Sequence, residues 1–342
     1  MEQRRLGTTD LFVSSICLGS MLWGSRNTPQ EAFEQLDYAV ASGVNFIDTA
    51  EMYAVPPQQE TYGRSEEIIG DWLAARKNRE QVIIASKVVG PSAHFPYIRD
   101  GAARLDEANI TAAVDASLRR LKTDIIDLYQ LHWPHRQVNS FGQLNYRHDP
   151  GEDYLDPQET LAALNKVIQA GKVRHIGLSN ETPWGVMRFL SSAPPRIVSI
   201  QNPYNLLNRS FEVGLAECAI RESCGLLAYA PLAAGTLSGQ YLDGSVPALS
   251  RRELHGEPGR YANPQADAAT AAYVALAREH GLEPCQMALA FVLAQPFVTS
   301  AIIGASRMTQ LKSDLAVAGM TLSPEVLAGI EVIRAQYPNP AA

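Results

Sequence analysis

Four side chains that can carry acid–base chemistry stand at or just beyond the ends of apolar runs in this 342-residue chain. Three such runs end on Asp48, Lys87 and His132, and Tyr53 follows Asp48 by five residues. A buried parallel strand reads as a continuous apolar run, and its first polar side chain comes at its carboxyl end. If these runs are neighbouring parallel strands, the four side chains gather at one rim, where α/β barrels keep their chemistry.

The four residue types suit proton transfer. A tyrosine phenol has a pKa of about 10, and a nearby ammonium stabilises the phenolate and lowers that pKa. Tyr53 beside Lys87 is therefore a better proton donor near neutral pH, and Asp48 would pair with Lys87 and fix its position. Taken singly, each residue has a simpler interpretation: a solvated strand-end charge, a lysine stem packed on apolar surface, or a core histidine.

The elements that must position these residues alternate along the chain. Helix signals lie between the strands, such as the cap pattern Thr28-Pro29 with Glu31 and the similar Asp156-Pro157 with Glu159. This alternation predicts a (β/α)₈ TIM barrel of the α/β class, and we find no linker, so residues 1–342 are expected to form one domain. The eight predicted strands are Ser15–Leu18, Asn45–Ile47, Val82–Lys87, Ile125–His132, Val173–Leu178, Ile197–Gln201, Leu226–Ala230 and Ser300–Ile303.

Two further features complete the predicted fold. Arg4–Ser14 contains two short strand-like pieces around Gly7-Thr8-Thr9-Asp10, which predicts an N-terminal β-hairpin. Three connections are too long for plain loops and are expected at the C-terminal face of the barrel. They are Val88–Ala108, Trp133–Leu155 and Leu232–Gln265.

Composition narrows the classes of partner. The net charge is −7 and no long basic run is present, which argues against nucleic acid or an anionic membrane surface. No apolar stretch reaches the roughly 18–20 residues that a membrane span needs. The N-terminus MEQRRLGTTD has no apolar signal-peptide core, and the four cysteines form no CxxC pair. We therefore expect a cytoplasmic protein with reduced thiols and no metal site.

In this order, Asp48, Tyr53, Lys87 and His132 resemble the catalytic tetrad of the aldo-keto reductases. The resemblance runs from about Arg4 to about Ile330 and points to the bacterial Tas-type, NADP(H)-dependent branch of that family. It implies that Tyr53 is the general acid and that His132 holds the carbonyl oxygen through a ring N–H. It also implies that the hairpin closes the bottom of the barrel. The segments that carry the branch resemblance are AEMYAVPP, IQNPYNLLNRSFEVGLAE and MALAFV, at Ala50–Pro57, Ile200–Glu217 and Met287–Val292.

The same resemblance assigns cofactor contacts in the second half of the chain. It implies that Ser179, Asn180 and Gln201 hydrogen-bond the nicotinamide carboxamide and that Tyr229 stacks on the nicotinamide. No GxGxxG follows a strand, so a Rossmann site is not expected. Glycine lets a main chain approach a diphosphate closely. The residues matched to the diphosphate loop are Leu232, Gly235, Leu237 and Gly239.

The eighth predicted strand leads into Ser306 and Arg307 at a helix N-terminus, which is an anion site. A hydroxyl and a guanidinium there suit a 2′-phosphate, so NADP(H) is favoured over NAD(H). Relatives often have asparagine at the position of Asp314, and many have Lys-Ser before the helix. The residues matched to adenine and ribose contacts are Gln310, Ser313 and Asp314.

The predicted substrate is a small aldehyde or ketone, because Met21, Trp23 and Trp133 would give the pocket beside Tyr53 an apolar and aromatic wall. Two alternatives remain open. A slow nucleotide-binding regulatory subunit, resembling the potassium-channel β subunits, would keep the same barrel. A phosphate-binding isomerase or aldolase with a Schiff-base Lys87 would leave Tyr53 and Tyr229 unexplained. The natural substrate, the reaction direction and the oligomeric state do not follow from the sequence.

Overall fold

Eight parallel strands close into a barrel in the computed structural model, which describes residues 1–192, 194–248, 250–255 and 259–342. The strand order around the barrel is β10-β3-β4-β5-β6-β7-β8-β9, so neighbours in sequence are neighbours in the sheet. The predicted (β/α)₈ TIM barrel is confirmed. The barrel strands are β3 (Ile16–Gly19), β4 (Phe46–Asp48), β5 (Ile83–Val88), β6 (Ile126–Leu131), β7 (Val173–Ser179), β8 (Ile197–Pro203), β9 (Leu226–Tyr229) and β10 (Val298–Ile303).

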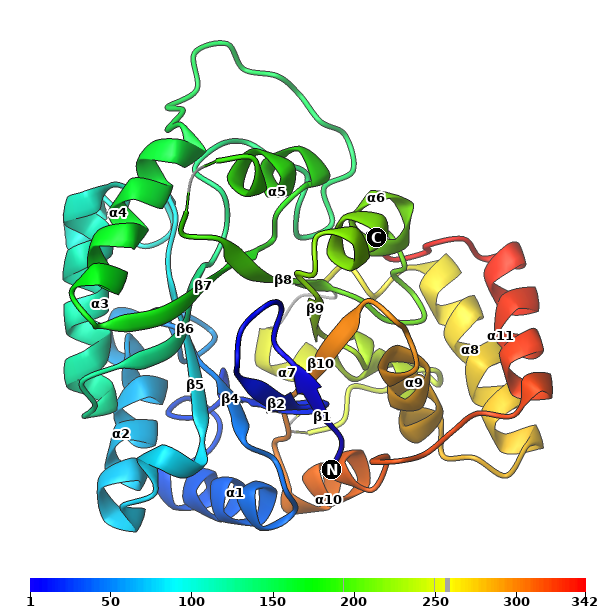
Figure 1. Ribbon diagram of the computed structural model, residues 1–342. Coiled ribbons are helices and arrows are strands. Elements are labelled where there is room, and N and C mark those ends of the chain that lie inside the picture. The colour runs from blue at the N-terminus through cyan, green and yellow to red at the C-terminus, as the bar shows by residue number, and fades with distance from the viewer. Residues whose placement is uncertain (193, 249, 256–258) are drawn as a thin grey trace.

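Helices surround the barrel (Figure 1). In the described residues, no helix is both long and apolar enough to cross a membrane. The α-helices are α1 (Pro29–Ala41), α2 (Arg64–Arg76), α3 (Glu107–Leu121), α4 (Pro157–Gln169), α5 (Pro183–Leu190), α6 (Phe211–Arg221), α7 (Arg251–His255), α8 (Pro264–Glu279), α9 (Pro284–Leu293), α10 (Met308–Leu315) and α11 (Pro324–Gln336). Short 3₁₀ helices cover Gln59–Thr61, Arg79–Gln81, Arg99–Gly101 and Ala233–Ser238.

Local cap signals explain where the helices begin. The Thr28 side chain accepts from the Glu31 N–H while the Glu31 carboxylate accepts from the Thr28 N–H, so the predicted capping box of α1 is present. Helix α8 begins at Pro264, directly after Asn263. Asn263 caps it there by accepting from the Ala266 N–H, because an asparagine followed by proline is itself a start signal.

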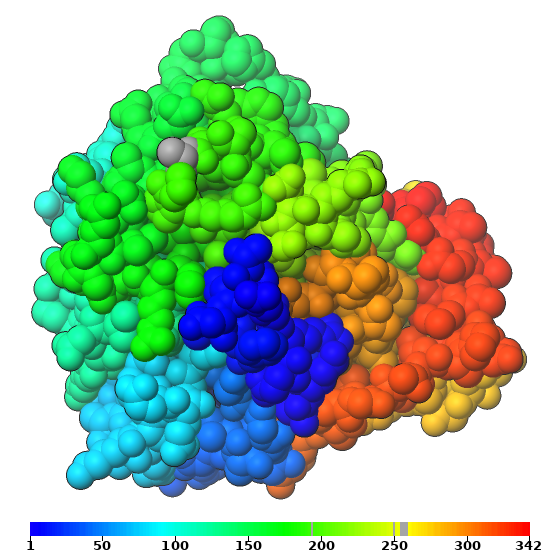
Figure 2. Space-filling model, in the orientation of Figure 1, coloured from blue at the N-terminus to red at the C-terminus, as the bar shows by residue number. Residues whose placement is uncertain are grey.

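The N-terminal hairpin closes one end of the barrel. Strands β1 (Gln3–Arg5) and β2 (Phe12–Ser14) pair antiparallel and lie across the barrel end in Figures 1 and 2. Leu6 and Val13 from this hairpin pack in one apolar cluster with side chains of the barrel interior, such as Phe46. Gly7 has φ +57°, and a Cβ there would lie 2.5 Å from the Val198 carbonyl oxygen, so only glycine fits this close approach. The expected hairpin plug is therefore present.

Strand alternation decides which side chains enter the barrel. Phe46, Ala85 and Leu128 belong to the interior cluster, and side chains two residues further along a strand point the same way. This parity sends Asp48 and Lys87 to the interior at the carboxyl ends of their strands. Residues between them, such as Ile47, pack outward against the helices. The fold therefore brings Asp48 and Lys87 to the C-terminal rim, and the hairpin fills the other end.

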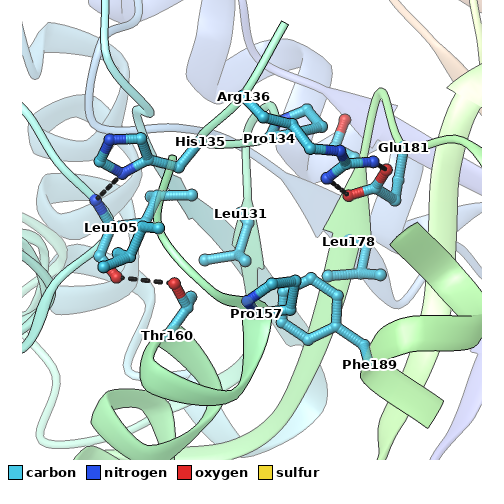
Figure 3. Close-up of a pocket in the computed structure, with 12 residues that line it drawn as sticks. Leu105, Leu131, Pro134, His135, Arg136, Pro157, Thr160, Leu178, Glu181 and Phe189 are labelled. Carbon is cyan, nitrogen blue, oxygen red and sulfur yellow. Dashed lines mark hydrogen bonds and ion pairs between the residues drawn. The ribbon is translucent and has the colours of Figure 1, made fainter. Parts of the chain in front are cut away.

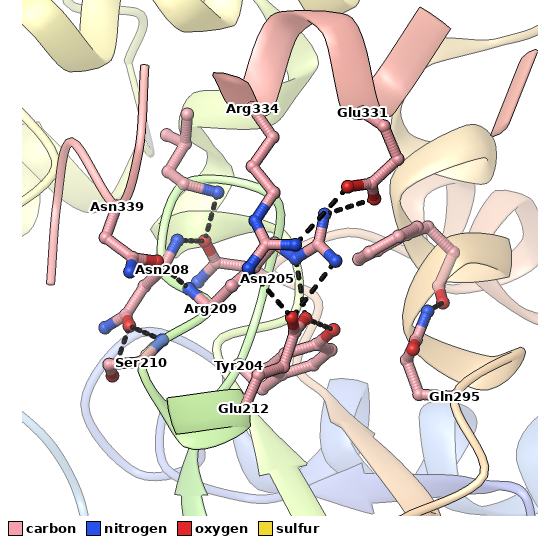
Figure 4. A network of polar contacts seen from close by, with 12 residues as sticks. Tyr204, Asn205, Asn208, Arg209, Ser210, Glu212, Gln295, Glu331, Arg334 and Asn339 are labelled. Carbon is pink, nitrogen blue, oxygen red and sulfur yellow. Dashed lines mark hydrogen bonds and ion pairs between the residues drawn. The ribbon is translucent and has the colours of Figure 1, made fainter. Parts of the chain in front are cut away.

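A polar network ties the C-terminal segment to the barrel. Arg209, which follows β8, donates to Glu212 at 2.6 Å and to Glu331 of α11 at 2.7 Å (Figure 4). The Asn339 side chain accepts from the Arg209 N–H, and the Ala341 N–H donates to the Leu207 carbonyl. The guanidinium also lies 4.9 Å from the centre of the Phe291 ring, so the buried cation is both paired and stacked.

Candidate active site

Asp48 and Lys87 form a buried ion pair at the C-terminal rim. Lys87 is fully buried and its Nζ donates to Asp48 Oδ2 at 2.6 Å and to the Thr49 carbonyl at 2.8 Å. Strands β4 and β5 place the pair, because Asp48 lies opposite Ala85 in the parallel register. A buried charge is tolerated only when it is paired and hydrogen-bonded, which both partners achieve here.

Two glutamines hold the other oxygen of Asp48. Gln201 of β8 donates to Asp48 Oδ1 at 2.8 Å, and Gln130 of β6 donates to the same atom at 3.2 Å. Gln201 also donates to Gln130 Oε1 at 3.1 Å. The sequence reasoning missed Gln130 as a site residue. Its parity with His132, two positions along the same run, is the signal that identifies it as facing the interior.

The environment of Lys87 favours its ammonium form. Burial acts to lower its pKa, but Asp48 and Tyr53 outweigh burial and raise the pKa above its ordinary value. A permanent cation therefore sits below the Tyr53 ring, whose centre lies 5.0 Å from Lys87 Nζ.

The surroundings of Tyr53 favour its protonated phenol. Burial raises its pKa most strongly, Lys87 lowers it, and Asp48 raises it, so that the net direction is upward from 10. The sequence prediction considered only the effect of the ammonium. Lys87 does act in the predicted direction, but burial in the site outweighs it. The phenol consequently carries its proton at neutral pH and can donate it.

His132 lies beside Tyr53 as a neutral imidazole. The two ring centres are 5.7 Å apart and nearly perpendicular. Burial and the nearby Lys87 ammonium lower the pKa of His132 well below 6.5. Its Nδ1 is buried and has no hydrogen-bond partner among the described residues. A neutral ring can offer one N–H to a bound group, which agrees with the predicted use of His132.

The predicted carboxamide contacts form one connected group on β7 and β8. Ser179 donates to the Gln201 carbonyl at 2.8 Å, and Asn180 donates to the His132 carbonyl at 2.8 Å. The Tyr229 hydroxyl donates to Asn180 Oδ1 at 2.7 Å. Tyr229 packs against the interior apolar cluster of the barrel. The structure therefore brings these four residues together next to His132.

The glycine-rich turn after β9 is folded on itself. The N–H groups of Gly235 and Leu237 both donate to the Leu232 carbonyl, and that of Gly239 donates to Thr236. These donors were predicted to face a diphosphate. In this structure they are already used within the turn, so a diphosphate would have to compete with these bonds.

The start of α10 brings Ser306, Arg307 and Gln310 together. Gln310 Oε1 accepts from the N–H groups of Ser306 and Arg307 and from the Ser306 hydroxyl. The Arg307 side chain is exposed and donates to the Ala248 carbonyl at 3.2 Å. An amide oxygen thus occupies the donors that a phosphate would use.

Further along α10, Ser313 and Asp314 face α9. The Ser313 carbonyl accepts from Gln286 at 3.2 Å. Asp314 is buried, and burial together with the nearby Glu283 carboxylate raises its pKa to about 7.

The three predicted pocket residues occupy different places. Trp133 lies 5.0 Å from the His132 ring, centre to centre, and its indole donates to the Pro91 carbonyl. Met21 lies beside Arg251, whose Nη1 is 3.1 Å from the Met21 sulfur. Trp23, by contrast, is 1% exposed in the main core and donates to Gln35 of α1. Its large ring fills the space between the barrel and α1, which is a packing position rather than an open pocket wall.

Arg251 is a second residue that the sequence reasoning missed. It opens α7 in the long segment after β9, and burial lowers the pKa of its guanidinium. It lies near Tyr53, and no carboxylate among the described residues pairs with it. A largely buried guanidinium near Tyr53 suits an anionic ligand. No sequence motif marks it, because its position depends on how the long segment folds.

A separate crevice lies on the outer side of β6 and β7, beneath α4 and α5 (Figure 3). Arg136 forms an ion pair with Glu181 at its edge, and the backbone N–H of Leu105 donates to His135 Nδ1. Leu131, Leu178 and other apolar side chains fill most of it. Its accessible interior is about 10 Å³, enough for one water molecule at most, so it is not a substrate site.

Comparisons with known proteins agree with this geometry. The model of the Aldo/keto reductase family matches residues 15–335. The chain is 51% identical to Protein tas of Escherichia coli (strain K12), over all of both chains. It is 40% identical to an aldo-keto reductase of Babesia bovis, over 69% of this chain and 88% of that protein. It is 29% identical to the L-glyceraldehyde 3-phosphate reductase of Escherichia coli (strain K12), over 97% and 92%. This chain therefore belongs to the aldo/keto reductase family of oxidoreductases.

Proposed function

We propose that the protein transfers a hydride from NADPH to the carbonyl of a small aldehyde or ketone, or catalyses the reverse oxidation. The observation that carries this proposal is the buried Asp48–Lys87 pair beneath Tyr53, with a neutral His132 beside it. Family membership supports carbonyl reduction in general. The preference for the phosphorylated cofactor rests on the residues at the start of α10.

The residues divide the chemistry between them. Bound NADPH supplies the hydride that adds to the carbonyl carbon. Tyr53 gives its phenol proton to the carbonyl oxygen as negative charge develops there. Lys87 stabilises the phenolate that remains, since its Nζ lies 5.0 Å from the Tyr53 ring centre. His132 offers a ring N–H to the same oxygen and so orients the substrate.

The site fits a nicotinamide nucleotide. Ser179, Asn180 and Gln201 lie beside His132 and would exchange their present hydrogen bonds for bonds to a carboxamide, and the Tyr229 ring would stack on the nicotinamide. The Arg251 guanidinium, which no carboxylate pairs with among the described residues, suits the negative charge of a diphosphate or phosphate. For the 2′-phosphate, Gln310 would leave the Ser306 and Arg307 N–H groups and Arg307 would turn from Ala248.

The test is a panel of aldehydes and ketones assayed with NADPH and with NADH, for the wild type and Tyr53→Phe. We expect reduction with NADPH, and a Tyr53→Phe rate at least ~10²-fold lower, as is typical for loss of a general acid. NADPH affinity should be nearly unchanged, because the phenol hydroxyl acts on the substrate. Tight NADPH binding without turnover of any carbonyl would refute the enzyme and favour a regulatory role. Turnover by Tyr53→Phe at the wild-type rate would remove Tyr53 as the acid.

A further inference from the structure

Glu51 is a buried carboxylate that the proposed chemistry does not use. It lies between Asp48 and Tyr53 in sequence and is completely buried. Its two oxygens accept four hydrogen bonds: from Arg99 at 2.7 and 3.0 Å, from the Val89 N–H at 2.7 Å and from the Tyr62 hydroxyl at 3.1 Å. This bidentate, fully satisfied arrangement fixes the side chain in one geometry.

The Glu51 side chain extends the pairing between the two segments that carry Tyr53 and Lys87. Beyond β4, the Thr49 N–H donates to the Ala85 carbonyl at 2.9 Å and the Glu51 N–H donates to the Lys87 carbonyl at 3.1 Å. The next donor along β5 is the Val89 N–H, and the Glu51 carboxylate accepts it. The Glu51 side chain thus accepts the hydrogen bond that a backbone carbonyl would accept if the parallel pairing continued.

The chain reverses direction at Tyr53, directly after this hydrogen bond. The Tyr53 N–H donates to the Ala50 carbonyl at 3.1 Å, which closes a turn around Glu51 and brings the phenol ring over Lys87. Arg99 enters from the long segment between β5 and α3 and also donates to Asn109 of α3 at 2.8 Å. One carboxylate therefore connects the Tyr53 turn, the segment after Lys87 and this long connection.

We propose that Glu51, paired with Arg99, is a positioning residue that holds the Tyr53 turn against the Lys87 strand end and so sets the distance between phenol and ammonium. The proposal rests on the proposed role of Tyr53 as proton donor. A 1 Å displacement of a reacting group is enough to lower a rate by about 10²-fold. Glu51 itself touches neither substrate nor cofactor, and it acts only through Tyr53.

Glu66 of α2 provides a matched control. It is also completely buried and is paired with an arginine, since Arg120 donates to it at 2.7 Å and the Ser86 hydroxyl at 2.5 Å. Its partners hold α2 and α3 to the outer side of β5, and its link to the Glu51 site is indirect, through Arg120, whose guanidinium lies 5.2 Å from the Tyr62 ring centre. Glu66→Gln therefore repeats the loss of a buried carboxylate without removing a hydrogen bond of Glu51.

The experiment compares wild type, Glu51→Gln and Glu66→Gln, each with 3-fluorotyrosine incorporated at position 53. The pH titration of the ¹⁹F signal reports the pKa of that phenol in the protein alone, with no substrate needed. Neutralising a nearby anion would by itself lower the phenol pKa, whereas moving the phenol away from Lys87 within the buried site raises it. The two explanations therefore predict opposite directions. Positioning predicts an upward move for Glu51→Gln and no change for Glu66→Gln.

Steady-state kinetics give the second readout. We expect kcat of Glu51→Gln to fall roughly 10- to 100-fold, with the Kd for NADPH within about 3-fold of wild type. Arg99→Lys keeps the charge but loses the bidentate geometry, so it should move kcat and the ¹⁹F titration in the same direction by less. If Glu51→Gln does not fold, Arg99→Lys tests the proposal in its place, because the Arg99 side chain is partly exposed, at 16%.

Each result either supports or overturns the positioning role proposed for Glu51. A downward or absent change in the Tyr53 titration for Glu51→Gln would overturn it, as would kinetic losses equal to those of Glu66→Gln. For Arg99→Lys, an unchanged titration and unchanged kcat would overturn it as well. If the wild type reduces no carbonyl, the proposed function fails, but the ¹⁹F titration still reports whether Glu51 positions Tyr53.

Discussion

At the scale of single residues, burial decides what Lys87 can do. Water cannot reach its Nζ, so the ammonium depends on Asp48 for its charge. Without that carboxylate, burial is the dominant influence and drives the lysine pKa down. Asp48 is therefore more than an anchor for the lysine, because it keeps the lysine in the form that stabilises a Tyr53 phenolate.

This dependence gives a prediction for two variants. Lys87→Met removes the cation at every pH, and activity should fall by roughly 10²- to 10⁴-fold throughout. Asp48→Asn lowers the pKa of Lys87, so its activity should approach wild type at low pH and be lost as pH rises through the lowered value. The measurement is kcat/KM from pH 5 to 9. Equal, pH-independent losses in both variants would show that the pair only supports the rim.

Asp127→Asn is the control for this comparison. Asp127 is also buried and paired with an arginine, Arg79, at 2.7 Å, but it sits near the start of β6, far along the strand from His132. Breaking a buried ion pair destabilises a protein by about 3–5 kcal/mol wherever it lies. The control should therefore lose stability without the new pH dependence.

At the scale of elements, the sequence predicts the site residues at strand ends better than the site residues in the long connecting segments. Asp48, Lys87 and His132 are recognisable because each ends an apolar run, and strand parity then requires them to face the interior. Gln130 follows from the same parity and could have been found. Arg251 could not, because its position depends on the fold of a long segment with no periodic pattern. Trp23 was misplaced for a similar reason: an aromatic in a loop packs inward or outward according to contacts with Gln35 of another element.

Helix α10 carries a buried acid, Asp314, whose pKa is raised to about 7 by burial and by Glu283. The folded protein therefore holds a proton there that the unfolded chain, with a pKa near 3.8, releases. Stability consequently falls as pH rises from about 4 to about 7, and the loss remains above that range. At about 1.4 kcal/mol per pKa unit, its upper bound is about 4 kcal/mol.

Asp314→Asn should remove this loss because the amide is neutral at every pH. We expect the variant to exceed wild type in unfolding free energy by the full amount at pH 8 and by a clearly smaller amount at pH 5, measured by urea denaturation. Asp115→Asn serves as the control, since Asp115 pairs with Lys172 at the surface with 37% of its side chain exposed. A gain of the same size at both pH values would contradict the linkage to this carboxyl.

At the scale of the whole molecule, ligand binding and folding are one equilibrium. The residues proposed to bind the cofactor come from β7, β8, β9, α7 and α10, which span much of the chain. A nucleotide bound across them stabilises the folded state by RT ln(1 + [L]/Kd), or about 2.7 kcal/mol at a hundred times Kd. For a chain of this size that corresponds to a rise in Tm of roughly 4 °C. Thermal unfolding thus reports cofactor choice without any substrate.

This linkage tests the assignment of Arg307. NADPH should raise Tm more than NADH at equal concentration, because only NADPH carries the 2′-phosphate that a guanidinium can pair with. Arg307→Ala should weaken the binding of NADPH by roughly 10- to 100-fold, the equivalent of a charge-assisted hydrogen bond of about 1.5–3 kcal/mol. The affinity for NADH should be unchanged. Arg221→Ala, at an exposed arginine on α6, should change neither. Arg307 also bonds the Ala248 carbonyl, so a purely structural role would reduce stabilisation by both nucleotides equally, and that result would remove Arg307 from the cofactor site.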